Sequence, residues 1–449
     1  MRKPKVAILT SLTDYSPAYS LTGVILDQAR MLHRAGYDYE LMCLEYFNPN
    51  DRAEIEREGL NATYKLGRTI LHDYQPFDEP KEDTPTQQGF YKQVDVYFNG
   101  DSTGLGYKQA LEPFDVIITH DLMFLSWYVP ENQAIRMCAD LWPDKRWLHW
   151  CHSAPTVIPG VIYPSKLRFE GCRNSMYISL NHRQRQDVAN MFGITPQDVG
   201  VVYNPKDIRD LYNFHADTCD FIQQYDILDH EILQVYPFST PRFGAKGVRH
   251  LLRIFGFWKK LGVRARLVLV NAHCNQDIDR PHEEEIIRYA ESCGLEIDRD
   301  VILTSRFARS RTDTEEGRHR YGLWTYSVPR KVVQELMLAA NMFIFPSISE
   351  ACSLIQAEAS IAGKFVVLNR NFVPMMEFGS PNTMHYEFTG RDPDQDPGYY
   401  EAVAREMWAH LQRDHIFTNT TLARTRTYNR DWIWRHQLEP LLYIGFSGS

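Results

Sequence analysis

The sequence predicts an α/β protein with two Rossmann-like domains. The chain has 449 residues, which is enough for two domains that each bury a full core. Short apolar segments alternate with amphipathic helical segments in residues 6–44, again in residues 115–202, and once more in residues 232–412. Short apolar segments between helices are typical of buried parallel strands. The alternation therefore predicts two open, mostly parallel sheets covered by helices.

The first domain opens with a predicted strand–helix–strand unit. Val6–Thr10 and Tyr39–Leu44 are the strands, and Val24–Ala35 is the helix that Gly36 ends. No Gly-x-Gly-x-x-Gly motif follows the first strand, so we do not expect a dinucleotide cofactor. Residues 48–112 interrupt the alternation with several prolines and an Asn-Gly-Asp turn, and they predict a hairpin with an extended loop.

Two later strands of this domain end in histidines. Asp115–Asp121 carries His120, and Arg146–Ser153 carries His149 and His152. Ligands bind at the carboxyl ends of strands in open α/β sheets, so these side chains are candidates for a site. A metal site formed by the three histidines is a weak alternative, because no carboxylate completes a ligand set at suitable spacing. We therefore predict no metal and assign His149 to the core.

The second domain begins with an apolar strand over Ile232–Pro237 and a basic loop. The loop contains Arg242 and Lys246 before Gly247, and a helix over 248–261 follows it. Arginine and lysine complement phosphate groups by charge and by their hydrogen-bond donors. A solvated basic turn is the ordinary structural alternative.

The most informative stretch runs from Pro346 to Ala359. The apolar strand Met342–Phe345 stops at the proline, and good helix formers begin at Ser353. The N–H groups of Ser353 and Leu354 would then form an anion site at a helix N-terminus. Glu350 and Glu358 flank this site. A phosphate flanked by groups that bear hydroxyls would satisfy these polar groups, which describes a sugar nucleotide. The alternative is a capping carboxylate and an unrelated surface glutamate.

The pattern Glu350-x7-Glu358 after Pro346-Ser347 resembles the signature of retaining glycosyltransferases with the GT-B fold, the group that includes glycogen synthase. The resemblance implies that Glu350 contacts the donor sugar, that Glu358 binds the ribose, and that amides after Glu350 bind the diphosphate. The sequence departs from the family's Glu-Gly-Phe-Gly, because Ala351-Cys352-Ser353 follows Glu350. The serine keeps the amide but narrows the space beside the phosphate.

The same resemblance assigns roles to other residues. It places Gly23 near the donor phosphates, His152 at the donor sugar, and His120 with Asp121 on the acceptor side. It also assigns the diphosphate to Arg242 and Lys246, although Pro241 stands where the family spacing expects the arginine. The catalytic residues it implies are Glu350, His152 and Lys246, and the donor-binding residues are Arg242, Lys246, Ser353, Leu354, Glu358 and Gly23.

For the fold, the resemblance implies GT-B, with two Rossmann-like domains facing each other across a cleft. The acceptor-side domain is expected at 1–205, with an insertion at 48–112. A C-terminal helix at about 428–449 is expected to cross back to it. The nucleotide-sugar-binding domain is expected at 206–427.

The resemblance implies an enzyme that moves a hexose from a nucleotide diphosphate, expected to be UDP in a donor such as UDP-glucose, to an acceptor hydroxyl. Retention of configuration and no metal or other cofactor are expected. A sugar-nucleotide epimerase or hydrolase of the same fold is an alternative, and so is a binding protein that has lost turnover. The acceptor is open among a saccharide, a lipid-linked sugar, a metabolite and a hydroxylated nucleobase.

Composition limits the partners. The net charge of −8 and the isoelectric point near 6.1 argue against general binding to nucleic acids or anionic membranes. Residues 306–327 nevertheless contain five arginines, which suggest either an anionic partner, DNA included, or a solvated loop of mixed charge. Eight scattered cysteines without a Cys-x-x-Cys pair predict reduced thiols. With no signal peptide or membrane-span pattern, a cytoplasmic location is expected.

Overall fold

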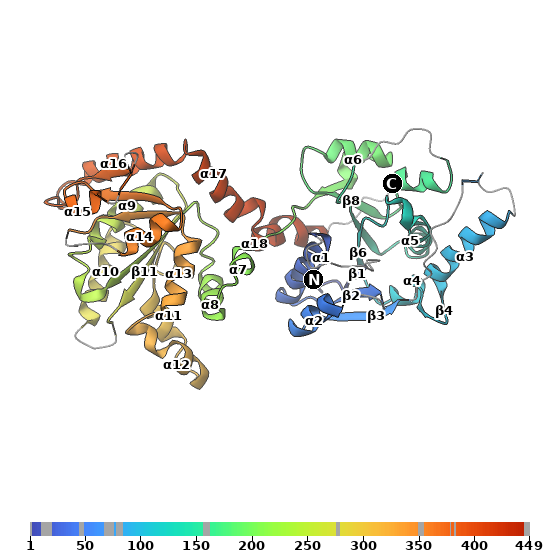
Figure 1. The fold of residues 1–449 in the computed structure, drawn as a ribbon, viewed down its shortest axis with the longest axis horizontal. Coiled ribbons are helices and arrows are strands. Elements are labelled where there is room, and N and C mark those ends of the chain that lie inside the picture. Colours follow the sequence, from blue (N-terminus) through green and yellow to red (C-terminus); the bar gives the residue numbers. More distant parts are fainter. Residues whose placement is uncertain are drawn as a thin grey trace. The chain divides into compact units, whose positions relative to one another are not determined.

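The computed structural model describes residues 2–9, 20–44, 49–66, 76–77, 84–155, 162–274, 279–348, 354–377, 379–380 and 383–443. The chain divides into two compact units. Unit 1 contains Met1–Pro205 and Arg430–Ser449, and unit 2 contains Lys206–Asn429 (Figure 1). The first crossing between the units falls where the sequence places the domain boundary. The return crossing lies two residues after the expected position 428.

Unit 1 is built on one sheet with the strand order β4-β5-β3-β2-β1-β6-β7-β8-β9. All neighbouring strands are parallel except the short pair β4 and β5. The order reverses between β1 and β6, so the carboxyl ends of these two strands mark the switch point where α/β sheets bind ligands. The strands are β1 (Val6–Leu9), β2 (Tyr39–Leu44), β3 (Ala62–Leu66), β4 (Gly100–Asp101), β5 (Gly104–Leu105), β6 (Val116–His120), β7 (Arg146–Trp150), β8 (Ser175–Ser179) and β9 (Val199–Val201).

The C-terminal segment packs on unit 1. Arg430, which opens α18 (Arg430–Ile433), is buried and lies 3.7 Å from the carboxylate of Asp27. The hydroxyl of Tyr37 donates a hydrogen bond to Glu439, at 2.9 Å. The predicted return of the C-terminal helix to the first domain is therefore confirmed. The other helices of unit 1 are α1 (Ser20–Arg34), α2 (Pro49–Arg57), α3 (Pro85–Asn99), α4 (Tyr107–Ala110), α5 (Val129–Leu141), α6 (Arg185–Phe192) and α19 (Glu439–Leu441).

The prediction for residues 48–112 is wrong in two places. Residues 49–66 form α2 and β3, and β3 extends the parallel sheet beside β2. Residues 94–98, which precede the Asn-Gly-Asp turn and would form the first arm of the expected hairpin, lie instead in α3, whose first turn Thr84 caps by accepting from the N–H of Gln87. Phe90, Val94 and Tyr97 share the buried face of this helix. Helical spacing and the cap therefore outweigh the local strand preference of the valines. A short hairpin, β4 and β5, does follow at Gly100–Leu105.

Unit 2 has two sets of three parallel strands, β10-β11-β12 and β13-β14-β15. They meet where the N–H of Asn341 donates to Leu233 O at 3.0 Å, and where Gln234 Nε2 donates to Ile344 O at 2.9 Å. The spatial order is therefore β12-β11-β10-β13-β14-β15, which reverses between β10 and β13. The strands are β10 (Ile232–Ser239), β11 (Ala265–Ala272), β12 (Val301–Leu303), β13 (Met342–Phe345), β14 (Phe365–Asn369) and β15 (Met384–Tyr386).

Helices cover the strands of unit 2, and a single hydrophobic core runs through it (Figure 1). The helices are α7 (Ile208–Leu211), α8 (Ala216–Tyr225), α9 (Val248–Lys260), α10 (Arg280–Ser292), α11 (Thr304–Ser310), α12 (Glu315–Tyr321), α13 (Arg330–Ala339), α14 (Leu354–Ile361), α15 (Val373–Met376), α16 (Pro397–Leu411) and α17 (His415–Leu422). Each unit is thus a Rossmann-like α/β layer structure, and the predicted fold class is confirmed at the level of each unit. The cleft of the GT-B fold stays a prediction.

The arginine-rich segment is helical and internally paired, where the sequence suggested a polar loop. It forms α11, α12 and a 3₁₀ turn at Gly322–Thr325. Its five arginines all have partners within unit 2: Arg306 pairs with Asp298, Arg309 with Glu283, Arg311 with Gln224, Arg318 with the carbonyl of Thr312, and Arg320 with Asp217 and Asp220. These contacts favour the mixed-charge interpretation over an anionic partner. Among the described residues, none of the helices combines the length and apolar character of a membrane span.

Candidate functional site

The basic loop of unit 2 leaves the carboxyl end of β10 and enters α9. A 3₁₀ turn at Thr240–Arg242 begins it, and the N–H of Lys246 donates to Arg242 O at 3.0 Å. The buried Tyr236 on β10 donates its hydroxyl to Lys246 O at 2.8 Å. The structure thus holds the main chain of Lys246 at the switch point and places Arg242 on the same loop.

This loop packs directly on the turn that follows β13. The N–H of Ile348 donates to Ala245 O at 3.1 Å. Gly247 has φ +70° and lies so close to the turn that an added Cβ would be 2.8 Å from the main-chain oxygen of Pro346. Only glycine combines this left-handed backbone with such a close approach. The basic loop and the first residues of the Pro346–Ala359 stretch are therefore neighbours at the carboxyl edge between β10 and β13.

The electrostatics of the loop suit an anion. Burial and the neighbouring Arg242 guanidinium lower the pKa of the half-buried Lys246 ammonium below its usual range. A lowered lysine pKa means that the surroundings disfavour its charged form. A phosphate bound beside both cations would offset the repulsion and restore the charge. Arg242 itself is exposed and can follow a ligand.

The helix α14 begins at Leu354, which is exposed, and Glu358 lies one turn into it. The Glu358 carboxylate is 3.6 Å from the guanidinium of Arg330 at the start of α13. The Glu358 side chain is 35% exposed and Arg330 is 83% exposed, so the pair is open to solvent and weak. A ribose hydroxyl could take the place of Arg330. Glu350 and Ser353 lie outside the described residues, and their roles stay predictions.

In unit 1, two of the predicted histidines contact each other. Nδ1 of His120, at the end of β6, lies 2.9 Å from Nε2 of His152, which follows β7. The rings are stacked, with centroids 5.2 Å apart. Nε2 of His120 lies 3.0 Å from the side-chain oxygen of Gln28 on α1. His120 and Gln28 are buried, while His152 is half-buried.

This chain of contacts favours one arrangement of the protons. The Gln28 oxygen can only accept, so Nε2–H of His120 donates to it and Nδ1 of His120 keeps a lone pair. Nε2–H of His152 then donates to that lone pair, which leaves the lone pair of His152 on Nδ1. Burial lowers the pKa of His152 to about 4, and burial with the neighbouring ring lowers the pKa of His120 well below its usual value. Both rings are neutral at pH 7.

Asp121 positions His152. The backbone of Asp121 has φ 58°, and its carboxylate accepts a hydrogen bond from the N–H of His152 at 2.7 Å. Its own N–H donates to Trp150 O at 2.9 Å. Burial raises the pKa of Asp121 to about 7. His120 and Asp121 thus lie with His152 at one strand edge, and Gly23 lies on α1, the helix that carries Gln28. That these residues face an acceptor, or donor phosphates, stays a prediction.

His149 is a core residue, as predicted. It is fully buried, and its two ring nitrogens contact the hydroxyls of Thr119 at 2.8 Å and Ser175 at 3.0 Å. Burial lowers its pKa to about 3. Within the described ranges, histidines, cysteines and carboxylates do not gather into a group of three that could hold a metal.

Sequence reasoning missed Gln28. A glutamine on the apolar face of a helix matches no motif, and only the tertiary contact with His120 reveals its role. The signal available in the sequence was its place on a buried face, between Val24 and Leu32, where an unpaired amide is costly.

Comparisons with known proteins give structural matches only. No family model matches the sequence, and no curated protein matches it. A glycosyltransferase from Rickettsia africae ESF-5 aligns over 98% of this chain and 98% of its own, with 12% identity and a TM-score of 0.33. Anabaena HepE in complex with UDP aligns over 99% and 100%, with 13% identity and a TM-score of 0.33.

A third match is a putative UDP-N-acetylglucosamine 2-epimerase from Listeria monocytogenes, over 97% of this chain and 94% of its own, with 11% identity and a TM-score of 0.31. The matches thus include a glycosyltransferase, a protein in complex with UDP and a putative sugar-nucleotide epimerase. At such scores they do not decide the site. The location of the candidate site therefore rests on the strand order and on the contacts within each unit.

Proposed function

We propose that this chain is a glycosyltransferase that moves a sugar from a nucleotide diphosphate, UDP in the first instance, to an acceptor hydroxyl. One observation carries the proposal. The loop that holds Arg242 and Lys246 packs on the Pro346 turn at the switch point of unit 2. This is the edge at which open α/β sheets bind nucleotides, and the basic loop meets the start of the Pro346–Ala359 stretch there.

In the proposed site, Lys246 and Arg242 neutralise the diphosphate as it leaves the sugar, which is the largest electrostatic demand of the reaction. Glu358 takes the ribose hydroxyls in exchange for Arg330. Glu350 contacts the donor sugar. Because two cations already face the phosphates, a metal ion is not required in this proposal. Retention of configuration follows from the resemblance of Glu350-x7-Glu358 and forms part of the proposal.

His152 has the second role. With its lone pair on Nδ1, it is a hydrogen-bond acceptor for a sugar hydroxyl, and Gln28 and His120 hold that tautomer. Asp121 fixes the backbone of His152. The four residues therefore present one oriented acceptor at the carboxyl edge of the unit 1 sheet.

Product analysis tests the proposal. The protein is incubated with UDP-glucose, UDP-galactose and UDP-N-acetylglucosamine, with and without a mixture of candidate acceptors, and the products are separated by mass. A glycosyltransferase forms a glycoside and UDP only when an acceptor is present. An altered UDP-sugar without acceptor would indicate an epimerase, and free sugar with UDP would indicate a hydrolase; either outcome would overturn the transfer reaction. The arginines of 306–320, which all have partners within unit 2, give no support to a DNA acceptor.

A further inference from the structure

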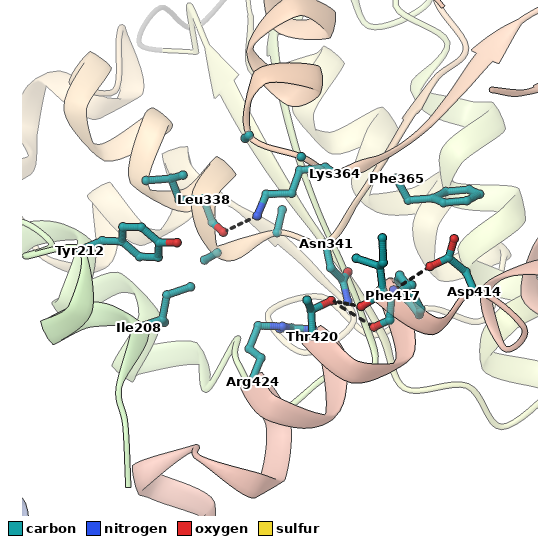
Figure 2. Close-up of a pocket in the computed structure, with 15 residues that line it drawn as sticks. Ile208, Tyr212, Leu338, Asn341, Lys364, Phe365, Asp414, Phe417, Thr420 and Arg424 are labelled. Carbon is teal, nitrogen blue, oxygen red and sulfur yellow. Dashed lines mark hydrogen bonds between the residues drawn. The ribbon is translucent and has the colours of Figure 1, made fainter. Parts of the chain in front are cut away.

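A cavity of about 410 Å³ lies in unit 2, away from the residues of the proposed donor site. Its walls come from α7, from the α13–β13 and α14–β14 turns, and from α17 with the π-helical segment Ala423–Thr427 that continues it. Figure 2 shows Lys364 and Phe365 on one side, Ile208 and Tyr212 on another, and Thr420 with Arg424 below. Its volume is within the range of small-molecule sites.

The cavity is at the opposite end of the strands from the proposed donor site. Met342 pairs with Phe365 at the amino ends of β13 and β14, and the cavity is lined by Asn341, Lys364 and Phe365. The Pro346 turn follows the carboxyl end of β13. Four strand residues separate the two ends, which is about 13 Å. A molecule in this cavity is therefore not part of the donor.

Two cations line the cavity. Nζ of Lys364 donates to Leu338 O at 2.8 Å and has two further donors, and no ion pair with a described carboxylate holds it. Arg424 donates to Leu228 O and His230 O, and its Nε is buried without a hydrogen-bond partner. Burial, together with the charge of Arg424, lowers the pKa of Lys364 to about 8.

Among the described residues that line the cavity, Asp414 is the one carboxylate, and it caps α17 by accepting from the N–H of Phe417 at 2.7 Å. Lys364, Arg424 and Asp414 together give the lining a net charge of +1. One added negative charge would neutralise it, and two would be repelled by Asp414. The remaining wall combines apolar side chains, among them Tyr212, Phe365 and Phe417, with the polar Asn341 and Thr420.

We propose that this cavity is a second ligand site, for a small organic monoanion, a carboxylate on an aromatic or aliphatic body. The carboxylate contacts Lys364, and the body packs on the apolar wall. The ligand would join α7 and α17, the segments beside the two crossings of the chain, to the strands β13 and β14. Because the cavity lies at the opposite end of the strands from the proposed donor site, its ligand is distinct from the donor, and the inference stands apart from the proposed function.

Calorimetric titration with 2-naphthoate tests this site, with uncharged 2-naphthamide as the matched control. We expect 2-naphthoate to bind at least tenfold more tightly than 2-naphthamide. Lys364→Gln keeps a donor for Leu338 O but removes the charge, and it should weaken 2-naphthoate at least tenfold. Lys260→Gln, the same change at an exposed lysine of the same unit, should leave the affinity unchanged.

Two further arms locate the site. Ala362→Phe fills the cavity while keeping Lys364, and it should abolish binding even if Lys364→Gln proves unstable. Lys246→Ala should leave binding unchanged, because Lys246 belongs to the other edge. Equal binding of naphthoate and naphthamide, or full affinity in Ala362→Phe, would overturn the proposal. Loss of binding in Lys246→Ala would move the anion to the donor site and overturn it as well.

Discussion

Gly247 and Pro346 approach so closely that a side chain at Gly247 would meet the main-chain oxygen of Pro346 at 2.8 Å. This contact joins the basic loop after β10 to the turn after β13. It is the part of the structure on which the donor site depends.

Gly247→Ala should therefore weaken both the fold and the donor site. The left-handed φ and the clash together cost about 1–3 kcal/mol, which shifts the melting temperature of a unit of this size by several degrees. UDP affinity should fall as the turn moves away from Lys246. Gly244→Ala is the matched control on the same loop, because an added Cβ there has no neighbour within 4 Å. Equal melting temperatures and affinities for the two variants would contradict the proposed contact.

Gln28→Leu should lower turnover about tenfold or more while leaving UDP affinity unchanged. Without the Gln28 oxygen, His120 can exchange its tautomer, and His152 no longer keeps its lone pair on Nδ1. Gln28→Glu retains an acceptor and should recover part of the rate. Thr22→Val, another buried polar position on α1, is the control. If Gln28→Leu loses stability but not kcat, Gln28 serves only the fold.

Unit 1 should lose stability as the pH falls from about 6.5 to 4. Burial lowers the pKa values of His120, His149 and His152. In this pH window the histidines of the unfolded chain therefore bind protons, whereas those of the native state stay neutral. Each contributes up to about 1.4 kcal/mol per pH unit. Asp121 acts in the opposite direction. Its pKa is raised to about 7, so its contribution to the stability of unit 1 is lost as the pH rises from about 4 to 7.

Calorimetry across this pH range checks the sign. His149→Gln should flatten the acid dependence without changing activity, since His149 lies in the core. Asp121→Asn should steepen it. A wild-type melting temperature that is constant from pH 6.5 to 4 would show that the histidines are not buried neutral.

Glu358→Ala should weaken UDP binding about tenfold while changing the melting temperature little. The ion pair with Arg330 is solvent-exposed, and such pairs contribute about 0–1 kcal/mol. Arg330→Ala should leave UDP affinity equal or slightly higher, because the ribose no longer competes with the guanidinium. If both variants bind UDP as the wild type does, Glu358 is only a partner of Arg330.

The sequence predicts most strands of both sheets, because buried parallel strands are continuous apolar runs such as Val6–Leu9 and Met342–Phe345. It fails at residues 94–98, where β-branched residues lie on a helix whose cap and buried face set the structure. The sequence cannot decide whether the arginines of 306–327 bind an anionic partner or pair within the protein. Ion pairs such as Arg320 with Asp217 join residues about a hundred positions apart.

In the candidate site, too, the sequence predicts local motifs but not contacts between distant residues. Motifs that use local spacing, such as Lys246 before Gly247, are visible in the sequence. The contact of His120 with His152, and the role of Gln28, depend on three separate elements and need the fold. The close approach of Gly247 to Pro346 is a tertiary property as well.

Titration of UDP into the wild type, Lys246→Ala and Lys260→Ala, with and without EDTA, tests the central claim most directly. The site proposed between the basic loop and the Pro346 turn predicts that UDP binds the wild type and Lys260→Ala equally, that EDTA changes neither, and that Lys246→Ala binds at least tenfold more weakly. Full UDP affinity in Lys246→Ala, or loss of binding on chelation, would contradict it.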